Sequence, residues 1–300
     1  MVHQLEAPGS ESIGGALDSR TETGLQGDTL LIRVKLCNLP PFHAAANRIV
    51  SLVGSRNADV APIATIVGGD PALAAEVLFL ANSSLFGFPA RIRSLRHAVA
   101  VLGLDRIRDI AVTVAMRALV RGAGPLIRPC WRHSVACATI AEAISPLFGG
   151  LTEQAYTAGL LHDVGRLGFL KSYAEEAGSV LRGEYSTVEE ELISERAALN
   201  VDHAAAGSWL VQYWDLPESF GEICEHHHEP LQENDSEPLQ VVKTACRLAD
   251  AAGFSAVRYK SPARYEDVLV SLPERIALES FPREDDLRDI VEARLKDFDV

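Results

Sequence analysis

Apolar residues recur every three or four positions from Phe42 to about Gly253, which is the period of an α-helix with one buried face. No segment keeps a regular alternation of apolar and polar residues, and no clear hairpin turn joins two strand-like runs. The pattern therefore predicts an all-α fold.

Residues that favour helix ends mark where these helices begin. Asp70 followed by Pro71 is an N-cap with a first-turn proline, Asp202 is another N-cap, and Ser186 with Glu189 is a capping box. The expected helices cover residues 28–39, 44–52, 59–66, 71–81, 94–102, 104–119, 130–148, 152–162, 166–182, 187–200, 203–214, 217–228, 238–253, 263–272, 273–279 and 285–296.

Changes in composition divide the chain into four parts. Residues 1–27 are rich in Gly, Ser, Glu and Thr without apolar periodicity, so a disordered tail is expected. The Gly- and Pro-containing stretch 122–129 separates an N-terminal helical subdomain, 28–122, from a second one, 123–255. Weaker helical signals over 256–300 predict a C-terminal helical extension.

Charge and cysteine content narrow the class of protein. The net charge is −13 and long Lys/Arg runs are missing, which argues against a general binder of nucleic acid or anionic membranes. Five cysteines without a CxxC motif indicate reduced, buried thiols. The N-terminus lacks the pattern of a signal peptide, and the apolar run 110–120 is too short to span a bilayer, so a cytoplasmic location is expected.

The segment 155–170 places His162 and Asp163 side by side in an apolar stretch that breaks at Gly165. A histidine and a carboxylate are costly to bury unless they pair, hydrogen-bond or bind a metal. Two interpretations follow from the dipeptide alone: a hydrogen-bonded core pair, or part of a metal site.

Further histidines and one aspartate occupy helix ends or apolar surroundings in the same half of the chain. They are His133, His203, His227, His228 and Asp250. Helix ends in a bundle can converge, and facing helices commonly hold a metal. Imidazole and carboxylate ligands suit iron, zinc, manganese or nickel, whereas a thiolate site is not expected because the cysteines are not clustered. His226 is expected to be a solvated surface residue.

The order His133, His162-Asp163, Asp250 resembles the H…HD…D pattern of the HD superfamily of metal-dependent phosphohydrolases. A finer match is to the HDOD domain, a bacterial signalling relative. The matching motifs are LPPF (39–42), DPALAAEVLFLANS (70–83) followed by FGFP, SLRHAVAVLGLDRIRD (94–109), WRHS (131–134), GLLHDVGRL (159–167), VDHAAAGSWL (201–210), WDLPESFGEIC (214–224) and HHEP (227–230). The resemblance covers about residues 39–250 and implies two packed helical subdomains, with an HD-like bundle following the N-terminal subdomain.

The resemblance also implies a ligand set for one or two divalent transition-metal ions. The primary site that it implies consists of His133, His162, Asp163 and Asp250. Likeness to the related HD-GYP phosphodiesterases implies a second site made of His203, His227 and His228, with Asp163 bridging the two ions. In a two-metal site, the ions activate a water and stabilise the oxygens of a phosphoryl transition state.

Asp163 and Arg166 are the residues expected to act in catalysis if the protein is an enzyme. Arg166 stands where HD-GYP enzymes carry a lysine, and it is either a phosphate contact or a surface residue after the turn at Gly165. The Gly-Tyr-Pro motif that follows HHE in those enzymes is missing after HHEP, so hydrolysis of cyclic di-GMP is not expected.

Two functions are compatible with this resemblance. The favoured hypothesis is a cytoplasmic regulatory module that acts through protein–protein or ligand-sensing contacts, with signalling proteins as partners and the metal site structural or sensory. The alternative is a metal-dependent phosphohydrolase or phosphodiesterase that acts on a nucleotide-like substrate. The C-terminal helices are candidates for a homodimer contact.

Overall fold

The computed structural model describes residues 29–55, 58–83, 91–122, 124–149 and 152–297. The predicted tail, residues 1–27, lies outside the described residues. The prediction of an all-α fold is confirmed: helices are the main regular structure of the described chain, and its sheet is limited to one short parallel pairing of β1 (Glu184–Tyr185) with β2 (Arg258–Tyr259). Among the described residues, no helix combines the length and apolar character needed to cross a bilayer.

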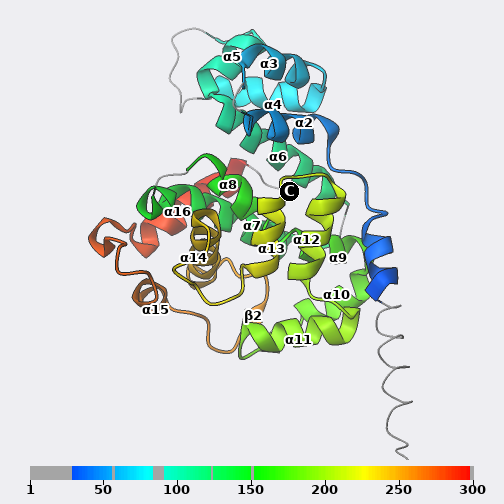
Figure 1. The fold of residues 1–300 in the computed structure, drawn as a ribbon, viewed down its shortest axis with the longest axis vertical. Coiled ribbons are helices and arrows are strands. Elements are labelled where there is room, and N and C mark those ends of the chain that lie inside the picture. The colour runs from blue at the N-terminus through cyan, green and yellow to red at the C-terminus, as the bar shows by residue number, and fades with distance from the viewer. Residues whose placement is uncertain (1–28, 56–57, 84–90, 123, 150–151, 298–300) are drawn as a thin grey trace, which may run out of the picture.

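A first group of helices forms one end of the molecule, drawn at the top of Figure 1. It consists of α2 (Ala44–Val53), α3 (Val60–Gly68), α4 (Pro71–Ala81), α5 (Leu95–Leu102) and the longer α6 (Leu104–Val120). The predicted N-cap at Asp70 is confirmed, since its side chain accepts a hydrogen bond from the backbone N–H of Leu73. Helix α6 carries a nearly continuous buried surface and also contacts α8 of the second group.

The second group surrounds a common core below the first. Its inner helices are α7 (Ile127–Ile144), α8 (Thr152–Leu161), α9 (Val164–Ser172), α12 (His203–Tyr213), α13 (Glu218–His226) and α14 (Glu237–Ala251). Helix α7 packs on α8 and α14, and α12 packs on α9 and α13. The outer elements are the 3-10 turn η1 (Ser145–Phe148), α10 (Ala174–Leu181), α11 (Val188–Leu199), α15 (Tyr265–Val270), η2 (Leu278–Ser280) and α16 (Glu284–Asp297).

The helix at residues 29–36 packs on the second group rather than on α2–α5. Arg33 donates a hydrogen bond to Oε1 of Gln212 at 2.8 Å, and Leu36 is fully buried. The proposed boundary between residues 122 and 123 remains a prediction.

Several predicted helix ends are wrong. The single helix expected over 166–182 is divided into α9 and α10, because Tyr173 leaves the helical conformation with φ −141° and ψ 54°. The capping box lies one residue later than expected: Thr187 accepts from the N–H of Glu190, and the Glu190 carboxylate accepts from the N–H of Ser186. In place of the helix expected over 273–279, the chain forms only the turn η2.

Candidate metal centre

His162 and Asp163 occupy the short turn between α8 and α9, and both side chains are buried. Two glycines hold this turn between neighbouring helices. A Cβ on Gly159 would lie 2.7 Å from Cα of Ala138 in α7, and one on Gly165 would lie 1.9 Å from the carbonyl oxygen of His203 in α12. The absence of side chains at these positions lets α8 approach α7 closely, and α9 approach α12, next to the His-Asp pair.

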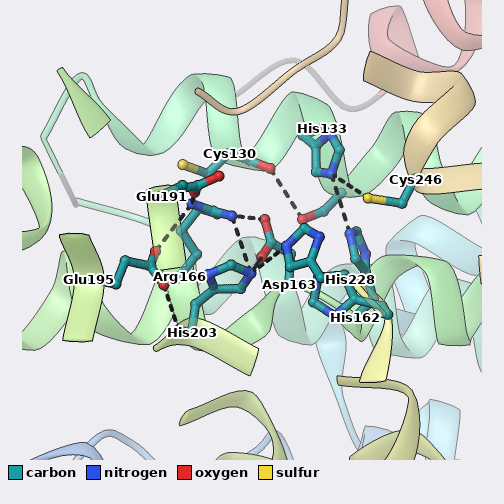
Figure 2. A network of polar contacts seen from close by, with 12 residues as sticks. Cys130, His133, His162, Asp163, Arg166, Glu191, Glu195, His203, His228 and Cys246 are labelled. Carbon is teal, nitrogen blue, oxygen red and sulfur yellow. Dashed lines mark hydrogen bonds and ion pairs between the residues drawn. The ribbon is translucent and has the colours of Figure 1, made fainter. Parts of the chain in front are cut away.

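The imidazoles of His133 and His162 face one another through Nε2, at a distance of 3.3 Å (Figure 2). Each ring is anchored on its other nitrogen: Nδ1 of His133 lies 3.0 Å from the carbonyl oxygen of Phe254, and Nδ1 of His162 lies 2.6 Å from that of Gly159. A carbonyl only accepts, so each Nδ1 carries the proton and each Nε2 presents a lone pair. Two lone pairs at this distance repel unless a cation lies between them.

Beside this pair, His227 and Asp163 each present an atom without a hydrogen-bond partner. His227 donates from Nδ1 to the carbonyl oxygen of Cys224 at 2.8 Å, while its Nε2 is buried and unpaired. Oδ1 of Asp163 is buried and likewise accepts no hydrogen bond. One atom each from His162, Asp163 and His227 fall within 4.8 Å of one another. Buried polar atoms left without a partner are costly, so this arrangement fits a bound cation.

His203 and His228 continue the cluster on the other side of Asp163. Their Nε2 atoms lie 2.9 Å apart, and Nδ1 of His203 lies 2.6 Å from Oε2 of Glu195. Nε2 of His203 is also 3.3 Å from Oδ1 of Asp163. Together with His227, these two histidines form a second group that could hold an ion.

Arg166 is buried beneath the cluster, and its guanidinium is shared by three carboxylates. Its Nε donates to Oδ2 of Asp163 at 2.8 Å, one of its terminal nitrogens lies 3.3 Å from Glu195, and it also pairs with Glu191. The interpretation of Arg166 as a surface residue is wrong, because only 4% of it is exposed. Its contact with a phosphate stays a prediction.

Sequence reasoning missed Glu191 and Glu195. Both lie on one face of α11, four residues apart, and both are buried. The hydroxyl of Tyr259 donates to Glu191 at 2.5 Å. The only signal was their helical spacing within an acidic run, which is more typical of a solvated helix face.

The protonation states suit metal ligands. Burial lowers the pKa of His162 to about 3, and burial together with neighbouring histidines holds the pKa of His227 and of His228 well below the usual value. Burial alone would raise the pKa of Asp163, but Arg166 and the nearby histidines keep it far below its usual range. Neutral imidazoles and an ionised carboxylate are the forms that bind a cation.

His203 differs from the other histidines of the cluster. Burial and the Arg166 guanidinium oppose its protonation, but the carboxylates of Glu195 and Asp163 outweigh them and raise its pKa. These carboxylates make protonation of His203 more favourable than that of His162, His227 or His228, so a metal ion at His203 competes with a proton.

Helix α14 contributes two residues to the same region. Oδ1 of Asp250 lies 3.4 Å from Nδ1 of His133, on the nitrogen that does not face His162. One turn earlier, Sγ of Cys246 lies 3.6 Å from Nε2 of His133. The role of Asp250 as a ligand stays a prediction. His226, by contrast, is 39% exposed and pairs with Glu229, which confirms its expected place at the surface.

A pocket of about 440 Å³ lies against the cluster. Its lining includes His227, His228, Cys246 and Asp250, and its other walls come from residues 186–188, Arg247, Tyr259 and the segment that follows β2. The pairing of β1 with β2 brings that segment next to the start of α11. The pocket gives an ion or a small ligand a route to the histidines.

The fold is built of helices, and imidazoles from several of them converge around a buried aspartate. These two features place the protein among helical proteins with a candidate metal centre. The model of the HDOD domain family matches residues 39–230, which is more than half of the chain. The chain therefore belongs to the HDOD family, as its motifs predicted.

Three solved structures share this fold. An HDOD domain protein of unknown function from Geobacter sulfurreducens is 26% identical, with a TM-score of 0.69, covering 92% of this chain and 95% of that one. A protein from Marinobacter aquaeolei VT8 with the provisional name signal transduction protein is 19% identical, with a TM-score of 0.64, covering 95% of this chain and 65% of that one. One from Shewanella amazonensis SB2B, provisionally named a metal-dependent phosphohydrolase, is 23% identical, with a TM-score of 0.59, covering 92% and 99%.

A curated relative, an uncharacterized protein of Treponema pallidum (strain Nichols), is 23% identical over 208 residues. The match takes in 68% of this chain but only 40% of that relative.

Proposed function

We propose that this chain is a regulatory HDOD module built around a transition-metal centre, and that it acts through contacts with signalling proteins or by sensing a small ligand. The observation that carries the metal centre is the pair of facing Nε2 atoms of His133 and His162, each fixed in its tautomer by a carbonyl on Nδ1. Hydrogen bonds of this kind on the outer nitrogen are typical of metal-binding histidines.

Two groups of side chains are proposed to hold one or two ions. His133 and His162 hold the first, for which Asp250 is a further candidate ligand, and His203, His227 and His228 hold the second. Asp163 lies between the two groups, and its Oδ1 accepts no hydrogen bond. Iron, manganese, zinc and nickel suit these donors. When bound, such an ion supplies Lewis acidity and can activate water.

Arg166 favours a regulatory role over catalysis. Likeness to the HD-GYP enzymes makes the cation at this position a candidate phosphate contact, but in this chain the guanidinium is buried and paired with Asp163, Glu191 and Glu195. A group so engaged would have to break buried ion pairs to reach a substrate, which is costly. The similarity in fold to the Marinobacter protein agrees with a signalling role.

The pocket supports a second candidate function, that of a metal-dependent phosphohydrolase. It adjoins His227 and His228 and also carries Arg247, so a nucleotide-like phosphoester could reach the ions. The fold shared with the Shewanella protein agrees with this alternative. It requires that Asp163 act in catalysis and that Arg166 leave its carboxylates.

A turnover assay tests the proposal. The purified protein is loaded separately with iron, manganese and zinc and offered a panel of nucleotides, phosphomonoesters and cyclic dinucleotides. We expect binding of metal without enzyme-like turnover. Rapid hydrolysis that is lost in Asp163→Ala would overturn the regulatory proposal and establish the phosphohydrolase.

A further inference from the structure

The candidate metal centre includes a further possible ligand atom, which the resemblance to the HD superfamily does not imply. Cys246 is buried on α14, and its sulfur lies 3.6 Å from Nε2 of His133. One donor atom each from His133, His162 and Cys246 fall within 4.8 Å of one another (Figure 2). The sulfur therefore approaches the ring nitrogen of His133 that presents a lone pair, because the other nitrogen, Nδ1, donates to the carbonyl oxygen of Phe254.

Asp250 and Cys246 occupy opposite sides of the His133 ring. They are four residues apart on α14, so both project from one face of the helix toward α7. The carboxylate of Asp250 approaches Nδ1, whereas the sulfur of Cys246 approaches Nε2, where the His162 ring also points. Of the two, Cys246 has the better position to share an ion with the imidazoles, and Asp250 has the position of a residue that orients His133.

We propose that Cys246 supplies a thiolate ligand to the ion held by His133 and His162, which makes this an imidazole–thiolate site for zinc or another thiophilic divalent metal. This inference rests on the proposed metal centre and names the metal class it selects. Thiolate ligands favour zinc and similar ions, whereas manganese and magnesium prefer oxygen.

Binding must displace a proton from sulfur. The thiol loses H⁺ to solvent as the metal–sulfur bond forms, so one proton is released for each ion that binds there. Cys246 lines the pocket beside the cluster. The contact of 3.6 Å between Sγ and Nε2 of His133 is within reach of a weak S–H donor, and a bound metal ion takes the place of that proton.

Cobalt(II) substitution tests the proposal by a signal other than activity. A thiolate bound to cobalt gives an intense charge-transfer band in the near ultraviolet, which imidazole and carboxylate ligands do not give. We expect the band in the wild-type protein, its loss in Cys246→Ser, and its retention in Cys130→Ser. Cys130 is a matched control because it is equally buried but its sulfur donates to the carbonyl of Leu126.

Affinity gives a second measurement. Cys246→Ser should weaken zinc binding by about 100-fold or more. This is a larger loss than that expected from removing a residue that only hydrogen-bonds to a ligand. Manganese binding should change far less. If Cys246→Ser does not fold, the cobalt spectra of Cys246→Ala and of the wild type still decide whether the sulfur is a ligand. Cobalt bound in stoichiometric amount without the band, or a band that survives in both Cys246 variants, overturns the thiolate while leaving the metal centre intact. No bound cobalt at all overturns both.

Discussion

Asp163 divides its two carboxylate oxygens between different environments. Oδ2 accepts a hydrogen bond from Nε of Arg166 at 2.8 Å, while Oδ1 faces the imidazoles without a hydrogen-bond partner. One oxygen is fixed by a buried cation of the protein and the other remains for a ligand. The guanidinium therefore orients the central carboxylate and offsets part of the negative charge of Asp163, Glu191 and Glu195.

Replacing Arg166 with Gln should destabilise the metal-free protein by about 3–5 kcal/mol, because three buried carboxylates lose their shared counter-ion. Urea unfolding in the presence of a chelator measures this. Arg196→Gln is the matched control, since Arg196 also pairs with two carboxylates but is 41% exposed. Its loss should cost about 0–1 kcal/mol. Equal effects of the two substitutions would contradict the role of Arg166.

Glu195→Gln should weaken metal binding, although Glu195 is proposed to act on His203 and not on the ion itself. Its carboxylate lies 2.6 Å from Nδ1 of His203 and fixes the orientation of that ring. Loss of such an outer partner typically lowers metal affinity about 10–100-fold. Calorimetric titration measures the change. Glu225→Gln, an exposed glutamate beside Ser208, should leave affinity unchanged. An unaltered affinity in Glu195→Gln would show that His203 is not a ligand.

Gly165→Ala should separate α9 from α12 and disturb the centre. The added Cβ would meet the carbonyl of His203 at 1.9 Å and the backbone nitrogen of Gly207 at 2.6 Å. We expect a loss of at least about 1–3 kcal/mol in the free energy of unfolding, with weaker metal binding. A Cβ on Gly124 has no neighbour within 4 Å, so Gly124→Ala should be neutral or slightly stabilising. Similar behaviour of the two variants would refute this packing.

Asp109 should make stability depend on pH, away from the metal centre. Burial raises its pKa to about 6, although Arg108 and the hydroxyl of Thr157 oppose the shift. Between about pH 4 and 6 the folded protein binds a proton that the unfolded chain has lost, so the free energy of unfolding falls as pH rises through this window.

Comparison with Asp109→Asn isolates this contribution. The wild-type curve should fall relative to that of the variant by up to about 1.4 kcal/mol per pH unit between pH 4 and 6. Both curves are measured by urea unfolding with chelator present. Curves that run parallel across this range would mean that Asp109 titrates normally.

Much of the fold could be predicted because local chemistry fixes it. The helical period of the apolar residues indicates the fold class, and Asp70 and Asp202 cap helices where their side chains can reach free N–H groups. The break at Tyr173 carries no such signal, since neither proline nor glycine stands there. The helices on either side, α9 and α10, pack on each other, a contact that the local sequence does not signal.

The candidate site was predictable only where residues follow a linear pattern. His133, His162 and Asp163 stand in the superfamily order, whereas Glu191 and Glu195 resemble the solvated residues of an acidic helix until α11 is placed against Arg166. Cys246 likewise could not be recognised as a possible ligand from the sequence, because it approaches His133 only when α14 packs on α7. These contacts join distant segments, so spacing along the chain cannot reveal them.

Metal analysis of the purified protein tests the central claim, that facing imidazoles hold an ion, most directly. Three proteins are compared after identical purification and reconstitution: wild type, His162→Ala and His226→Ala. We predict at least one tightly bound transition-metal ion per chain in the wild type and in His226→Ala, whose histidine is exposed, and a clear loss in His162→Ala. A wild-type protein that binds no metal even after reconstitution, or equal metal in all three, would contradict the account.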